Sequence, residues 1–136
     1  MFKKKAQVSI EYLTITAFLL IVSGLVFGFA LFSFNENASI AKADDSVTTI
    51  VNNANLVASQ GNGSKIFFEI DVPPNVTSFE INGKSVTMAV NTSLGSGDMF
   101  SYAKPNLTPI NLSTHQGVKT LSATFTDGNV VVAEIA

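Results

Sequence analysis

The chain has 136 residues, of which 13% are charged, and a formal net charge of -2 at pH 7. This length fits one small domain with an appendage, and so mild a charge does not favour nucleic acid as a partner. The absence of cysteine excludes disulfides, thiolate metal sites and thiol nucleophiles.

The chain begins with a basic cluster that is followed by a long apolar stretch. Lys3, Lys4 and Lys5 form the cluster, and residues 12–34, which number 23, contain no charge. About 20 apolar residues suffice for a helix to cross the bilayer core. The positive-inside rule predicts a cytoplasmic N-terminus and an extracellular location for everything after residue 34.

Beyond residue 34 the pattern becomes amphipathic. Its period predicts one helix from about Val8 to Ser59, roughly 78 Å long. Residues 7–34 are expected to form an apolar transmembrane or filament-core part, and residues 35–60 an amphipathic continuation. The glycines in residues 60–64 should end the helix, because glycine adopts the left-handed conformation of helix C-caps. The apolar stripe of the continuation consists of Ile40, Ala43, Val47, Ile50, Val51, Ala54, Val57 and Ala58.

Residues 61–136 show the period of two that is typical of strands, which predicts a β-rich extracellular head domain. A strand over 66–72 stops at two prolines, and residues 94–116 are expected to form loops with one short strand near 100–103. Asn82-Gly83 predicts a hairpin with a type I′ turn, and Asp127-Gly128 a second hairpin.

The fold class predicted from these patterns is α+β. A long N-terminal helix should carry a small antiparallel β-sandwich-like head, whose sheet packs one face on the helix stripe between Ile40 and Ala58.

A polar patch separates the lysines from the apolar stretch, and it contains the carboxylate of Glu11. An ionised carboxylate at membrane depth is unfavourable, so its presence implies a partner. Residues 5–12, KAQVSIEY, resemble the class III signal peptide of archaeal type IV pilin-like proteins, in which Q-x-S-x-E-[YF] follows a short basic leader.

The resemblance implies cleavage by a prepilin peptidase between Ala6 and Gln7, which removes residues 1–6 as a leader. It further implies that Glu11 pairs with the new amine of Gln7 on a neighbouring subunit during assembly, unless Gln7 cyclises to pyroglutamate and removes that amine. A cytoplasmic assembly ATPase and a polytopic membrane platform are the other implied partners.

Gly24 and Gly28 form a G-x-x-x-G pattern, which permits close approach of helices but also occurs by chance in apolar segments. Two other interpretations of the N-terminus stay open. One is an ordinary signal anchor. The other is a secretory signal peptide cut after Ala30, following the small-x-small sequence Gly28-Phe29-Ala30.

N-x-[ST] sequons are more frequent than expected, since 12 asparagines and a Ser/Thr frequency near 19% would give about two by chance. All lie on the side of the apolar stretch that is predicted to be extracellular. They therefore predict acceptors for surface glycans, at Asn37, Asn62, Asn75, Asn91, Asn106 and Asn111.

No residue pattern favours an enzyme, a metal site or a cofactor. His115 has no acid cluster or cysteine nearby, Asp44 and Asp45 point about 100° apart on a helix, and Asp98 is a lone acid in a glycine-rich stretch.

The sequence therefore predicts a structural subunit of an adhesive, type IV pilus-like surface filament that polymerises through its N-terminal helix. Two alternatives remain: a monomeric membrane-tethered β-domain that binds a surface ligand, and an archaellin-like motility filament subunit.

Overall fold

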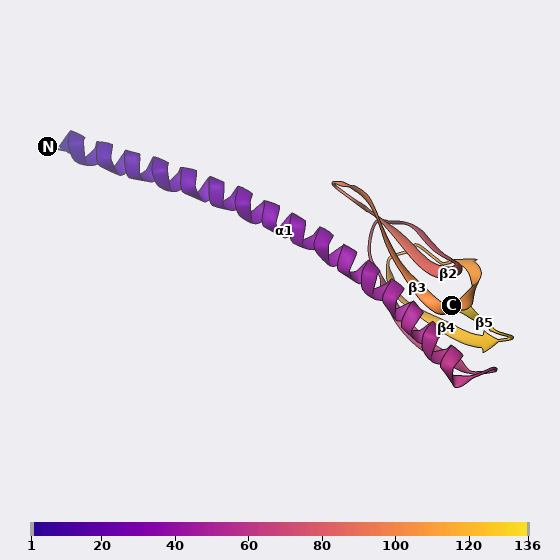
Figure 1. Cartoon of the computed structure of the whole chain (residues 1–136). Helices are drawn as coiled ribbons and strands as arrows, with labels where there is room; N and C mark the ends of the chain where they lie inside the picture. Colours follow the sequence, from indigo (N-terminus) through magenta and orange to yellow (C-terminus); the bar gives the residue numbers. More distant parts are fainter. Residues whose placement is uncertain (1, 136) are drawn as a thin grey trace. The chain divides into compact units, whose positions relative to one another are not determined.

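The computed structural model describes residues 2–135 and has the predicted α+β architecture (Figure 1). The chain divides into two compact units, the first ending at Glu36 and the second beginning at Asn37. The elements are α1 (Phe2–Gln60), β1 (Lys65–Val72), β2 (Val76–Thr92), β3 (Gly95–Asn111), β4 (Gly117–Thr126) and β5 (Asn129–Ile135).

The predicted helix is confirmed. It starts at Phe2 rather than near Val8, because the residues of the lysine cluster are also helical. It ends as predicted after Gln60. Gly61 and Gly63 have φ of 99° and 88°, a conformation that side-chain-bearing residues rarely adopt. The Gly63 N–H donates to the carbonyl of Phe125 over 2.8 Å, which joins the turn to β4.

The five strands form a single sheet in the order β1-β4-β5-β3-β2. The neighbours β1·β4, β4·β5 and β2·β3 are antiparallel, as expected, but β3 and β5 are parallel where Asn106 and Leu107 face Asn129 and Val130. The head is therefore one mixed sheet rather than an all-antiparallel sandwich. Its second layer is the C-terminal part of α1.

The strand β2 turns back on itself at Asn82–Gly83. The Asn91 N–H donates to the carbonyl of Asn75 over 2.9 Å, whereas a straight strand would hold these residues roughly 50 Å apart. The hairpin predicted here is confirmed. Its turn is not type I′, because only Gly83 of the pair has a positive φ. The second predicted hairpin, β4 to β5, is also confirmed.

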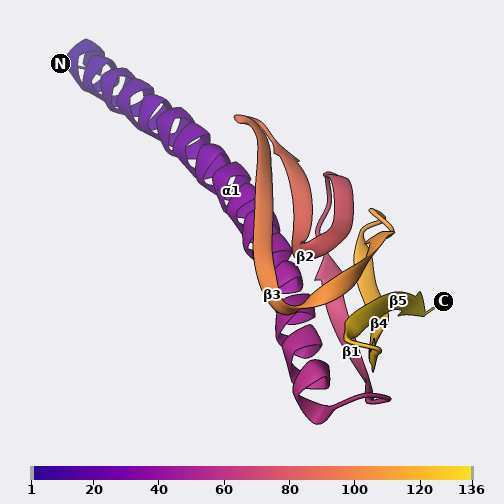
Figure 2. The same cartoon turned by 45° about the vertical axis from the view of Figure 1, so that its right-hand side comes forward.

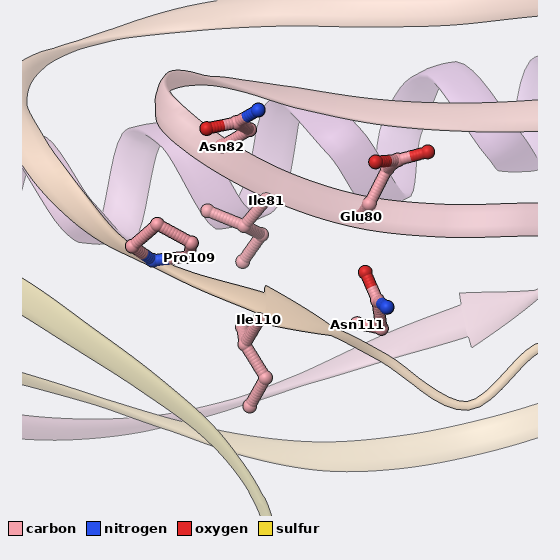
Figure 3. A pocket seen from close by; sticks show the side chains of 6 residues that line it. All are labelled: Glu80, Ile81, Asn82, Pro109, Ile110 and Asn111. Atoms are coloured by element: carbon pink, nitrogen blue, oxygen red, sulfur yellow. The ribbon is translucent and has the colours of Figure 1, made fainter.

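The strand β3 wraps around the turn of β2, as Figure 3 shows beside Asn82. Residues 95–102 pair with the second half of β2, and residues 107–111 with the first half. In the intervening bend, the Lys104 N–H donates to Asn55 Oδ1 of α1 over 2.8 Å, and Pro105 has no N–H. The prediction of loops over 94–116 was wrong, since β2 provides a pairing partner for most of that stretch.

The core lies between the C-terminal part of α1 and one face of the sheet (Figure 2). Figure 2 shows the magenta end of the helix running along the strands. Ser46, 1% exposed, donates from its hydroxyl to the carbonyl of Asp71 in β1 over 2.9 Å. The predicted packing of the helix stripe is confirmed, because the buried apolar residues of the helix are Ala43, Val47, Ile50, Val51, Ala54 and Val57.

Candidate functional site

The first candidate site is the apolar part of α1, which Figure 1 shows as a continuous helix. Within residues 8–34 the large apolar side chains are exposed, from 39% for Val22 to 74% for Tyr12 and Phe29. Part of α1 is long and apolar enough to cross a membrane. The core of the second unit contains none of these side chains. They therefore require an apolar environment from outside the chain.

Two threonines show how the segment accommodates polar groups. Thr14 and Thr16 donate from Oγ1 to the carbonyls of Ile10 and Tyr12, both over 2.9 Å. A hydroxyl that bonds four residues back on its own helix needs no water. Both groups are thus compatible with lipid or with a packed helix bundle.

The polar patch at the start of the segment is on the surface. Ala6, Gln7 and Glu11 are all exposed. Across residues 2–135, the Glu11 carboxylate makes no hydrogen bond or ion pair. Within residues 2–135, the structure of one chain therefore brings no counter-charge to Glu11.

The two glycines of the G-x-x-x-G pattern have no side chains, so the helix backbone is uncovered at these positions. Gly24 and Gly28 lie four residues apart, so they share one face of the helix. A Cβ added at either position would meet no atom within 4 Å. Within residues 2–135 no close contact requires glycine at either position, so the space beside them is open to another helix.

The sequon asparagines form the second candidate site, and all six are exposed. Their settings differ. Asn37 lies within α1, Asn75 is in a turn with φ of 64°, and the Asn62 Oδ1 accepts the Asp127 N–H over 3.0 Å. Three lie in strands and have defined cross-strand partners: Asn91 faces Ser96, Asn106 faces Asn129 and Asn111 faces Glu80.

Two shallow grooves adjoin the last of these sequons. The larger, of about 320 Å³, runs between β2 and β3 (Figure 3). A second groove, of about 270 Å³, shares Glu80 and Asn111 with it. Neither groove was predicted from the sequence, because the wrapping of β3 around β2 brings distant residues together. The larger groove is lined by Glu80, Ile81, Asn82, Pro109, Ile110 and Asn111.

The histidine and the three acids considered in the sequence form no metal-ligating cluster within residues 2–135. His115 is exposed, and its backbone N–H donates to the Ser113 hydroxyl over 3.4 Å. Asp44, Asp45 and Asp98 are exposed. The residues described contain no cluster of three metal-ligating side chains.

Comparison of the chain with protein-family models, curated proteins and solved structures found no match.

Proposed function

We propose that the chain is a structural subunit of a type IV pilus-like surface filament that serves adhesion. In this proposal a prepilin peptidase removes residues 1–6 while the apolar helix holds the subunit in the membrane. An assembly ATPase and a membrane platform then stack subunits so that their helices form the filament core. The role is structural rather than enzymatic.

The observation that carries the proposal is the exposed apolar surface of α1. Residues 12–34 have no charge and present large side chains that the chain does not bury. Full burial of one such side chain stabilises by about 1.5–3 kcal/mol relative to water. Lipid provides the required environment before assembly, and the same segment of neighbouring copies provides it outside the membrane.

Glu11 supports assembly rather than simple anchoring. A plain anchor gains nothing from a carboxylate at the start of its apolar segment, whereas a polymer gains a fixed register. The amine created at Gln7 by cleavage, on the neighbouring subunit, is the counter-charge of the proposal. A charge buried without its partner is strongly unfavourable, so a misregistered subunit would be rejected.

The test is Glu11→Ala, with Glu69→Ala on the exposed surface of β1 as the matched control. We expect thin surface fibres in negative-stain micrographs of cells with the original chain or the control. The Glu11→Ala chain should be present in the membrane with its leader removed, but without fibres. Fibres of normal number and length from the Glu11→Ala chain would refute the assembly role and favour the monomeric tethered domain.

Leader removal has its own measurement. Mass spectrometry of the mature N-terminus should find Gln7, as glutamine or as pyroglutamate, in the first position. A mature chain that begins at residue 1 would refute the cleavage, and one that begins near Leu31 would identify a secretory signal peptide.

A further inference from the structure

Four outward-facing side chains of the larger groove form a compact arrangement. Glu80 and Asn111 are cross-strand partners, and Ile81 faces Ile110 in the same ladder. The register shifts between Ile81 and Gly83, and Asn82 and Pro109 line the groove at this irregularity. Figure 3 shows Glu80, Asn82 and Asn111 on one side of the strands, whereas Ile110 points to the other side.

The spacing of this arrangement follows from sheet geometry. Partners across the ladder lie about 5 Å apart, and residues two apart along a strand lie roughly 6.6 Å apart. The result is a small, exposed surface with a carboxylate, two amides and the flat carbon ring of Pro109. A sugar ring, which has hydroxyls at its rim and C–H groups on its faces, matches both parts of this surface.

The chain itself places a sugar acceptor at one corner. Asn111 begins the sequon completed by Ser113, and its side chain is exposed. Among the three sequon asparagines that lie in strands, only Asn111 faces a charged residue. Within residues 2–135, the Glu80 carboxylate makes no ion pair or hydrogen bond, so its oxygens are free to accept.

We propose that Asn111 carries an N-linked glycan whose first sugar lies in the groove against Pro109 and donates a hydrogen bond from its N–H or a hydroxyl to Glu80. This inference rests on the proposed extracellular placement of the head. Attachment forms a bond between Asn111 Nδ2 and the anomeric carbon of a lipid-phosphate-activated glycan. The anomeric C–O bond breaks, the phosphate leaves with its lipid carrier, and Nδ2 loses one proton to a base of the transferring enzyme.

A carboxylate is a suitable acceptor for this role. Hydrogen bonds to an ionised acceptor are roughly twice as strong as those between neutral groups. The tether at Asn111 also fixes the sugar close to its partner, so little orientational freedom remains to be lost on docking. The glycan should therefore stabilise the head, and it should do so through Glu80.

The experiment uses the full chain in detergent and compares two chains under two conditions, with a third chain as control. The original chain and Glu80→Gln are each produced in cells with the glycosylation machinery and in cells without it. Peptide mass spectrometry reports the sugar at Asn111, and thermal unfolding reports the head. The Asn106→Gln chain, which loses a neighbouring sequon outside the groove, is the control for a general effect of glycans.

We expect sugar mass on the peptide that contains Asn111, with or without the Glu80 substitution. The glycan should raise the unfolding midpoint of the original chain by about 4 °C, a shift measurable for a domain of this size. Glu80→Gln should remove most of that gain in the glycosylated chain and change the midpoint little without the glycan. Asn106→Gln should leave the gain in place.

Two results would overturn the inference. One is an unmodified Asn111 peptide from glycosylating cells. The other is an equal effect of Glu80→Gln with and without the glycan, since a coupling of zero means that the two groups do not interact. Fibre counts in the same cells test the filament proposal separately, so either proposal can fail while the other stands.

Discussion

Truncation of Ile50 should most clearly show that the C-terminal part of α1 is packed against the sheet. It is fully buried between the helix and the sheet. Ile50→Ala removes buried carbon and leaves a cavity that the surrounding side chains fill only partly. Such substitutions cost about 2–5 kcal/mol. The lower end applies if the sheet relaxes toward the helix, and the upper end if it does not.

Thermal unfolding of the full chain in detergent measures this cost. In a domain of 60–100 residues, 1 kcal/mol shifts the midpoint by about 4–8 °C, so Ile50→Ala should lower it by at least about 8 °C. Leu56→Ala is the matched control, since Leu56 lies on the same helix and is 49% exposed. It should cost less than about 1.5 kcal/mol. Equal shifts for the two variants would refute the packing of this helix face against the sheet.

Three further substitutions test individual contacts in the second unit by the same unfolding assay. Gly61→Ala should destabilise by about 1–2 kcal/mol, because its φ of 99° is unfavourable for alanine; no change would contradict the capping role. Asn55→Ala should cost about 1 kcal/mol and speed exchange of the Lys104 amide proton, its partner at 2.8 Å; unchanged exchange would argue against that bond. Asp71→Asn should cost less than about 1 kcal/mol, because the ion pair with Lys42, although 2.7 Å long, is half exposed; a large loss would show that the pair is stronger than its exposure indicates.

The elements that the sequence predicted well have local causes. The helix follows from an uninterrupted pattern, and its end from glycines at positions that need a positive φ. The β4–β5 hairpin follows from Asp127-Gly128, whose φ values of 50° and 82° are both positive, as a type I′ turn requires. In each case a few neighbouring residues determine the backbone.

The elements that the sequence predicted poorly depend on distant residues. The strand β3 contains glycines, serines and prolines that individually favour loops, yet it pairs with both halves of β2. Its parallel contact with β5 likewise depends on how β3 bends. No local pattern contains that information.

The candidate sites also divide into those with local causes in the sequence and those that depend on distant residues or on another molecule. The six sequon asparagines are exposed, which glycan acceptors need to be. The groove beside Asn111 was not predicted, because its two sides are about 30 positions apart. The partner of Glu11 belongs to another molecule in the proposed function, so one chain does not contain it.

The change in helix pattern near residue 36 leads to a last prediction. Every residue of the buried core cluster lies at or beyond Ala43, so the second unit has a core of its own. A chain that starts at Asn37 keeps this core and begins its helix with asparagine, which is favourable at a helix N-cap.

We therefore expect the fragment 37–136 to be folded and monomeric without detergent, because it lacks the exposed apolar segment. Light scattering coupled to size exclusion should give the mass of one chain, and its unfolding midpoint should respond to Ile50→Ala as that of the full chain does. Aggregation of the fragment, or a broad transition that is insensitive to Ile50, would mean that the head depends on the N-terminal segment. In that case the apolar helix would be part of the fold, and its exposed surface would no longer argue for assembly.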